Sequence, residues 1–250
     1  MMHDETSTES IPHQSRWLDT LDDAAAVDTM AADQITAARA VAAAAAAIEA
    51  AAAAVFARLK ASPESRLFYA GAGTSARIGV QDGVELTPTF GWPQQRTGYL
   101  IAGGTAALTQ SIEGAEDNTE AAMAAVTDAG IGQHDVVIGI AASGSTPYTC
   151  AAVTAAKTAG ALTVGIANNS DAPLVAAADC GITLITGSES VAGSTRMKAG
   201  TAQKICLNII STLVMVRMGK VRNGLMVGMQ ATNEKLRRRQ QKIDALLKDQ

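Results

Sequence analysis

Five short apolar runs separated by helix-like segments constrain this chain more than any other feature of its sequence. None of the runs alternates strictly between apolar and polar residues, which is typical of strands that are covered on both faces. Strands that alternate with helical segments form βαβ units and a parallel sheet. We therefore predict an α/β fold of three layers, a five-stranded parallel sheet flanked by helices, with strands within 66–73, 97–104, 135–143, 161–169 and 180–187.

Helical segments flank this series on both sides. Residues 17–60 are rich in alanine and contain no Gly or Pro, so intrinsic propensity favours helix, and Pro63 then ends the pattern. Residues 194–220 have apolar side chains at near-helical spacing, which indicates a long buried helix. The expected organisation is an N-terminal helical segment over 1–60, an α/β domain over 61–228 and a charged amphipathic helix over 229–250.

Charge and cysteine usage exclude several classes of protein. The formal net charge of −4 argues against a nucleic-acid partner, and the alanine-rich stretch 40–56 is too weakly apolar to cross a membrane. An acidic, polar start is unlike a signal peptide, so we expect a cytoplasmic protein. The cysteines Cys150, Cys180 and Cys206 lack metal-ligand spacing, and we expect them to be buried free thiols. The histidines His3, His13 and His134 also lack such spacing, so we expect no metal site.

The first expected strand runs into a turn that suits a phosphate group. Gly73, Thr74 and Ser75 follow an apolar run and precede a helical segment, where backbone N–H groups and hydroxyls attract an anion. The third glycine of a dinucleotide fingerprint is not in place. A tight turn with a serine cap explains the same residues without a ligand.

A second hydroxyl-rich turn follows the third expected strand, at Ser143, Gly144, Ser145 and Thr146. Two such turns at one sheet edge favour a sugar phosphate over a nucleotide, although ordinary helix capping remains the alternative. A polar stretch before the last long helix adds candidates, among which Ser194 is a donor and Lys198 or Arg196 is a cation for phosphate. The whole stretch offers Glu189, Ser194, Thr195, Arg196, Lys198, Thr201, Gln203 and Lys204.

Acidic residues after the second expected strand have two interpretations. Glu113, Glu116, Asp117 and Glu120 stand where a helix begins, and acidic residues there are favoured by the helix dipole. Capping by Asp117 or Asn118 explains them without chemistry. Residue chemistry alone likewise leaves Glu85 as a surface carboxylate.

Several longer sequence motifs, which occur in a fixed order along the chain, favour a chemical role for these acidic residues. The chain carries "GAGTSARIGV", "PTFG", "LIAGG", "EGAED", "GIAASGSTPY", "GSTRMKAGTAQK" and "LMVGMQATNEKL" between residues 69 and 236. With these blocks it resembles the sugar isomerase (SIS) domain superfamily, and most closely the N-acetylmuramic acid 6-phosphate etherases. Mammalian glucokinase regulatory protein shares parts of the pattern.

The resemblance implies a cofactor-free, homodimeric lyase that acts in amino-sugar and cell-wall catabolism. Its reaction converts N-acetylmuramic acid 6-phosphate to N-acetylglucosamine 6-phosphate and D-lactate, by elimination followed by addition of water. In the family pattern Glu85 matches the general acid and Glu116, the second glutamate of "EGAE", matches the base. One glutamate must be protonated while the other is ionised, which requires two different environments, and burial is expected at Glu85. The expected phosphate ligands are Gly73, Thr74, Ser75, Ser143, Gly144, Ser145, Thr146, Ser194 and Lys198.

The sequence departs from the family at a few positions. Ala76 replaces a glycine, which adds a methyl group beside the first turn, and "ELTPT" over 85–89 replaces "ECPPT". Gly228 stands in place of an Asp, and the family's small C-terminal helical region is expected to be absent. Two other functions remain open, a SIS-type sugar-phosphate isomerase and a non-catalytic sugar-phosphate-binding regulator. Retention of both glutamates favours the etherase, because a regulator needs no acid-base pair.

Overall fold

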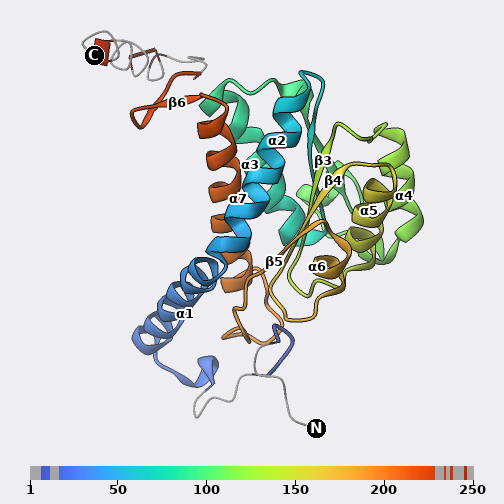
Figure 1. Cartoon of the computed structure of the whole chain (residues 1–250). Coiled ribbons are helices and arrows are strands. Elements are labelled where there is room, and N and C mark those ends of the chain that lie inside the picture. Colours follow the sequence, from blue (N-terminus) through green and yellow to red (C-terminus); the bar gives the residue numbers. More distant parts are fainter. Residues whose placement is uncertain (1–6, 12–16, 229–233, 235–236, 239–244, 247–250) are drawn as a thin grey trace.

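A computed structural model describes residues 7–11 and 17–228, together with residues 234, 237–238 and 245–246. Five parallel strands form one sheet in the order β2-β1-β3-β4-β5 (Figure 1). All five lie inside the predicted runs, at β1 (Leu67–Gly71), β2 (Thr97–Ile101), β3 (Val136–Ala141), β4 (Leu162–Ala167) and β5 (Cys180–Thr183). The predicted five-stranded parallel sheet is confirmed.

Side chains on the two faces of the sheet enter two separate hydrophobic clusters. Leu67 and Tyr69 of β1 pack in one cluster with α2 (Ala45–Ala61), α3 (Gly73–Phe90) and α7 (Lys198–Arg217). Phe68 and Ala70 point the other way, toward α4 (Thr119–Asp128), α5 (Pro147–Thr158) and α6 (Pro173–Ala177). This alternation along a strand buries both faces and produces the predicted three layers.

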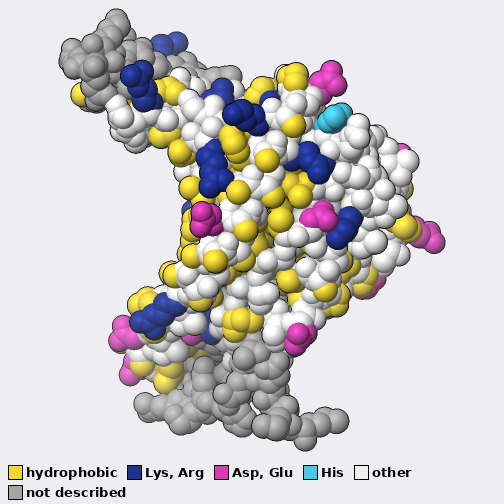
Figure 2. Space-filling view, viewed as in Figure 1, with side chains coloured by type: hydrophobic (Ala, Val, Ile, Leu, Met, Phe, Trp, Pro, Cys, Tyr) yellow, Lys and Arg dark blue, Asp and Glu magenta, His cyan; other side chains and the backbone are white. Residues whose placement is uncertain are grey.

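The alanine-rich N-terminal region is helical but not straight. It forms α1 (Asp23–Ala43) and α2, which meet at Ala44 with a bend of 61°. Asp22 caps the start of α1 by accepting the Ala25 N–H at 2.8 Å, and α2 ends at Ala61, directly before Ser62 and Pro63 as expected. Figure 2 shows the outer surface of this layer, where hydrophobic side chains lie among scattered charged ones.

Short elements complete the described chain. They are the 3₁₀ turns η1 (Leu18–Thr20), η2 (Gln94–Arg96), η3 (Thr105–Leu108) and η4 (Ala115–Asp117), and the two-stranded hairpin of β6 (Val221–Arg222) and β7 (Leu225–Met226). The charged helix expected over 229–250 falls almost entirely outside the described residues.

Helix α7 is the one described helix that is long and apolar enough, by itself, to cross a membrane. Of its most apolar window, 56% is buried within the molecule. Its side chains Leu207, Ile210 and Val214 belong to the hydrophobic cluster that also contains Leu67 and Tyr69 of β1. These contacts are those of a core helix in a folded domain.

Candidate active site

The order of the strands marks one place on the sheet edge where a ligand fits best. The chain leaves β1 for β2 on one side and returns to place β3 on the other side of β1. The connections after β1 and β3 therefore diverge and leave a crevice beyond the carboxyl ends of these two strands. Both hydroxyl-rich turns of the sequence follow these strands, at Gly71 and Ala141.

The first turn opens helix α3. Ala72 occupies the position before the helix in an extended conformation and supplies no side-chain cap, so the first N–H groups of α3 are not capped by a side chain. Thr74 and Ser75 lie in the first turn of the helix. The serine cap considered as an alternative is not formed, and uncapped N–H groups at a helix start suit an anion.

The second turn opens helix α5. Gly144 has a φ of +71°, and a Cβ there would lie 2.3 Å from the Cβ of Ala172, so only glycine fits. Ser143 Oγ accepts the backbone N–H and the hydroxyl of Ser145, each at 3.2 Å. Thr146 stands at the cap position without making a side-chain cap hydrogen bond, and Pro147 follows it in the first turn of α5. The hydroxyls of this turn are therefore not used for helix capping.

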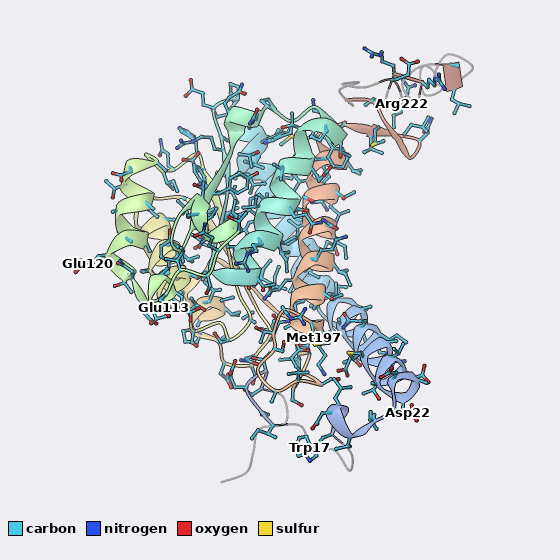
Figure 3. The ribbon with its side chains drawn as sticks, turned by 180° about the vertical axis from the view of Figure 1, so that it is seen from behind. Trp17, Asp22, Glu113, Glu120, Met197 and Arg222 are labelled. Carbon is cyan, nitrogen blue, oxygen red and sulfur yellow. The ribbon has the colours of Figure 1, made fainter. Side chains whose placement is uncertain are left out.

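A cavity of about 400 Å³ lies between the two turns. Among the expected ligands it is lined by Gly73, Thr74, Ser75, Ser143, Ser145 and Thr146. Glu116, in η4, lines this cavity and also an adjoining one of about 200 Å³, which Glu113 borders. In Figure 3 the labelled Glu113 lies toward the same end of the molecule as Met197, which directly precedes α7. The structure thus brings Glu116 and both hydroxyl-rich turns together.

The acidic stretch divides into two roles. Asn118 caps α4 by accepting the Ala121 N–H at 2.9 Å, so the capping interpretation holds for this residue. Glu116 and Asp117 lie one and two residues earlier and line the cavity instead. Glu120 is exposed in the first turn of α4.

Glu85 does not reach this cavity within one chain. It lies twelve residues after Gly73 on the same helix, which at 1.5 Å per residue is about 18 Å along α3. Its side chain is exposed, and the expected burial is not found. The neighbouring Val84 is also 55% exposed. The two predicted catalytic glutamates of one chain are therefore well separated.

Lys198 has a partner from the N-terminal helix. Its Nζ lies 3.4 Å from Oδ1 of Asp33, and both side chains are largely buried. Asp33 also accepts a hydrogen bond from the Ser190 hydroxyl. This ion pair ties α1 to the start of α7, and Lys198 does not line the cavity between the turns.

The rest of the polar stretch before α7 is mostly structural. Glu189 is fully buried and accepts the backbone N–H groups of Lys198 and Ala199 at 3.1 and 2.9 Å. Burial raises the pKa of Glu189, an effect that these two N–H groups oppose. Ser194 is half-buried and does not line the cavity, whereas the adjacent Thr195 does.

Two departures from the family pattern have simple structural explanations. The Ala76 side chain belongs to a small apolar cluster with Ile101 and Ala107, and it does not line the cavity. Gly228 approaches the end of α3 so closely that a Cβ there would lie 2.2 Å from the carbonyl oxygen of Phe90. A larger residue at 228 would force this backbone contact apart.

A buried polar network holds α3 against α7 and the sheet. Asp82 is 5% exposed and accepts hydrogen bonds from the hydroxyl of Tyr69 at 2.7 Å, from Nδ2 of Asn208 at 2.6 Å and from the hydroxyl of Ser211 at 3.0 Å. Burial and the nearby Asp82 carboxylate raise the pKa of Tyr69 well above its ordinary value. The network fixes the rotation of α3, so that Val84 and Glu85 face outward.

The described residues hold no group of three His, Cys, Asp or Glu side chains able to bind a metal ion. Cys206 is buried, while Cys150 and Cys180 are half-buried, and all three are free thiols. Burial raises the pKa of each thiol, that of Cys206 to about 12.

Two residues that are not among the expected phosphate ligands also line the cavity. Glu9 reaches it from the N-terminal segment, and Thr195 reaches it from the loop before α7. Thr195 belongs to the polar stretch that the sequence indicates, but the residue expected to bind phosphate there is its neighbour Ser194. No local pattern in the sequence points to Glu9.

The chain is similar in sequence to a family of SIS domains and to several named etherases. The family described as glucokinase regulatory protein N-terminal SIS domain matches residues 50–157. A Deinococcus radiodurans protein named N-acetylmuramic acid 6-phosphate etherase is 50% identical over 242 residues, which is 97% of this chain and 79% of the relative. A Streptomyces avermitilis protein of the same name is 51% identical over 181 residues. That match covers 72% of this chain but only 58% of the relative's length.

Solved structures of low sequence identity share the fold. A phosphoheptose isomerase from Francisella tularensis has a TM-score of 0.55 at 18% identity, covering 78% of this chain and 97% of its own. The Vibrio vulnificus NanR protein, complexed with ManNAc-6P, has a TM-score of 0.50 at 14% identity, covering 88% of this chain and 69% of its own. These likenesses bear out the SIS-type α/β fold.

Proposed function

Since the chain belongs to the N-acetylmuramic acid 6-phosphate etherase family, we propose that it cleaves the D-lactyl ether of N-acetylmuramic acid 6-phosphate. The products are N-acetylglucosamine 6-phosphate and D-lactate. Such an enzyme acts in the cytoplasm, in the catabolism of cell-wall amino sugars. The observation that carries the proposal is the cavity at the switch point of the sheet, where Glu116 faces two hydroxyl-rich turns.

The donor side of the cavity suits the phosphate group of this substrate. The starts of α3 and α5 both lack a side-chain cap, so their N–H groups are available to phosphate oxygens. Hydroxyls of Thr74, Ser75 and Ser143 add neutral donors around the same space. Neutral donors and helix starts bind a phosphate without a resident cation.

Glu116 is the proposed base. In the open-chain aldehyde the proton on carbon 2 is acidified by the carbonyl group, so a carboxylate can remove it. The electron pair then forms a double bond between carbons 2 and 3 while the bond from carbon 3 to the ether oxygen breaks. A general acid protonates that oxygen as lactate leaves, and water afterwards adds to carbon 3 of the unsaturated aldehyde.

Glu85 is the proposed acid, and it must come from a second copy of the chain. About 18 Å along α3 separates it from the turn at Gly73. A substrate bound beside Glu116 does not span that distance. If both glutamates act on one substrate, Glu85 of the partner subunit completes the site, which supports the proposed homodimer.

The outer face of α3 offers a contact that achieves this. Figure 3 shows α3 on the outside of the molecule, beside α7 and in front of the sheet. Two copies of α3 packed antiparallel about a two-fold axis near Val80 would place residue 85 of one copy opposite residue 75 of the other. Half-buried Val80 and exposed Val84 supply apolar surface for such a self-complementary contact.

Measuring D-lactate release from N-acetylmuramic acid 6-phosphate tests the proposal. Release by the wild-type chain is expected, whereas the Glu116→Gln chain should release lactate about 100-fold more slowly or less. N-acetylmuramic acid without phosphate serves as the control substrate and should react poorly. Tight binding of the phosphosugar without release would instead support the regulator, and conversion of an aldose phosphate that carries a free hydroxyl group at carbon 2 to its ketose would support the isomerase.

A further inference from the structure

The N-terminal segment Ser7–Ile11 is built into the cavity, far in sequence from the rest of its lining. Thr8 is fully buried, and its backbone N–H donates to Oδ1 of Asn169 at 2.8 Å. Asn169 returns a hydrogen bond from Nδ2 to the Thr8 hydroxyl at 3.1 Å and contacts the Ser143 carbonyl oxygen at 3.3 Å. Asn169 follows β4, so this side chain fastens the segment to the turn that opens α5.

A compact turn within the segment directs Glu9 toward the cavity. Ser10 N–H donates to the Ser7 carbonyl oxygen at 3.1 Å, and Glu9 N–H donates to the Ser7 hydroxyl at 3.2 Å. Glu9 then lines the cavity, opposite the loop that contains Gly193. Figure 1 shows the segment in blue beneath the strands, beside the orange loop that leads into α7.

The cavity has two chemically different sides. Its donors are the starts of α3 and α5 and the hydroxyls of the two turns, whereas its three carboxylic side chains are Glu9, Glu116 and Asp117. No Lys or Arg is among the described residues that line it. A bare phosphate is attracted by the donors and repelled by the carboxylates. A phosphorylated polyol satisfies both sides, because its hydroxyl and amide N–H groups donate to carboxylate oxygens.

We propose that Glu9 is a substrate-binding residue, which accepts a hydrogen bond from a hydroxyl or amide N–H group of the bound amino-sugar phosphate. The pairing of Thr8 with Asn169 holds it in place, so the N-terminal segment forms one wall of the site. The identity of the sugar rests on the proposed function, whereas the role of Glu9 as acceptor rests on the cavity. Glu9 thereby selects ligands that carry donors next to a phosphate.

Titration calorimetry with two ligands tests this role. N-acetylglucosamine 6-phosphate and inorganic phosphate are titrated into the wild-type, Glu9→Gln and Glu49→Gln chains. Glu49 is an exposed glutamate on α2 and serves as the matched control. Glu9→Gln should weaken the sugar phosphate by about 10-fold and leave inorganic phosphate unchanged or slightly tighter, because one charged acceptor is lost. Glu49→Gln should change neither.

A second variant distinguishes the contribution of the whole N-terminal segment to binding from that of the Glu9 carboxylate alone. Asn169→Ala removes the side chain that fastens Thr8, so it should weaken the sugar phosphate at least as much as Glu9→Gln does. Equal loss for both ligands in Glu9→Gln, or no loss for the sugar phosphate, would overturn the proposal. A wild-type chain that fails to bind the sugar phosphate would overturn it as well.

The binding readout is independent of catalysis. If the wild-type chain binds the sugar phosphate through Glu9 but releases no D-lactate, the etherase proposal fails and the role of Glu9 stands. If D-lactate is released with the same KM by the wild-type and Glu9→Gln chains, the etherase stands and the role of Glu9 fails.

Discussion

Mixing Glu85→Gln chains with Glu116→Gln chains is expected to restore D-lactate release that neither variant shows alone. Each variant by itself lacks one of the two groups in every site, so each should lose about 100-fold or more of the wild-type rate. In a mixed dimer, one site combines the Glu116 of one chain with the Glu85 of the other. That site is intact, and the second site of the same dimer lacks both groups.

The size of the recovery follows from counting sites. About 18 Å along α3 separates Glu85 from Gly73, which lines the same cavity as Glu116, so one chain does not supply both glutamates to one substrate. Equal amounts of the two variants, exchanged freely, give mixed dimers in about half of the population. One active site in each mixed dimer makes about a quarter of all sites active, so the rate should reach about a quarter of the wild-type rate per chain.

The assay requires subunit exchange and a matched control. The two chains are mixed at low concentration, concentrated again, and assayed for D-lactate with a coupled dehydrogenase. A chain that carries both substitutions, exchanged freely with an equal amount of wild type, should leave about a quarter of all sites active, because each site of a mixed dimer then lacks one glutamate. Simple dilution of sites that lie within one chain would leave about half. A mixture no faster than the average of the two separate variants would refute an intersubunit site, and so would full activity of either variant alone.

Two further predictions concern stability. Asp82→Ala leaves two buried donors and one half-buried donor without their acceptor. It should lower the free energy of unfolding by about 3–5 kcal/mol, measured with urea, and a change below about 1 kcal/mol would contradict the role of the network. These donors belong to Tyr69, Asn208 and Ser211. The second prediction concerns Asp179, whose pKa lies below its ordinary value of 3.8. Partial burial raises this pKa, but hydrogen bonds from Thr163 and the ion pair with Lys157 lower it by more. Its stabilising effect is therefore present above that pH and lost as the pH falls below it, so the Tm advantage of wild type over Asp179→Asn should shrink between pH 5 and about pH 2. A Tm difference that is independent of pH would count against this pairing.

The strands and the meeting of the two hydroxyl-rich turns could be predicted, because both follow from local patterns in the sequence. Apolar runs such as 135–143 report burial on both faces, and hydroxyl-rich turns after β1 and β3 report the sheet edge at which they end. Parallel strands bring their carboxyl ends together, so the meeting of Ser75 and Ser145 at one cavity follows from the fold class.

Features that depend on distant contacts could not be predicted. Glu9 enters the cavity through the bond between Thr8 and Asn169, which joins residues 161 positions apart. The bend at Ala44 lies in a run of alanines that contains no stop signal, and it arises where both helices pack on α7. The position of Glu85 depends on which face of α3 is buried, and the buried Asp82 on that face is a polar residue that a hydrophobic pattern misses.

Isotope placement in the products tests the proposed reaction most directly. The chain is incubated with N-acetylmuramic acid 6-phosphate in ¹⁸O-labelled water, and both products are analysed by mass spectrometry with fragmentation. Elimination followed by addition of water predicts ¹⁸O at carbon 3 of N-acetylglucosamine 6-phosphate and none in the hydroxyl group of D-lactate. Label in that hydroxyl group, or the absence of both products, would contradict the account.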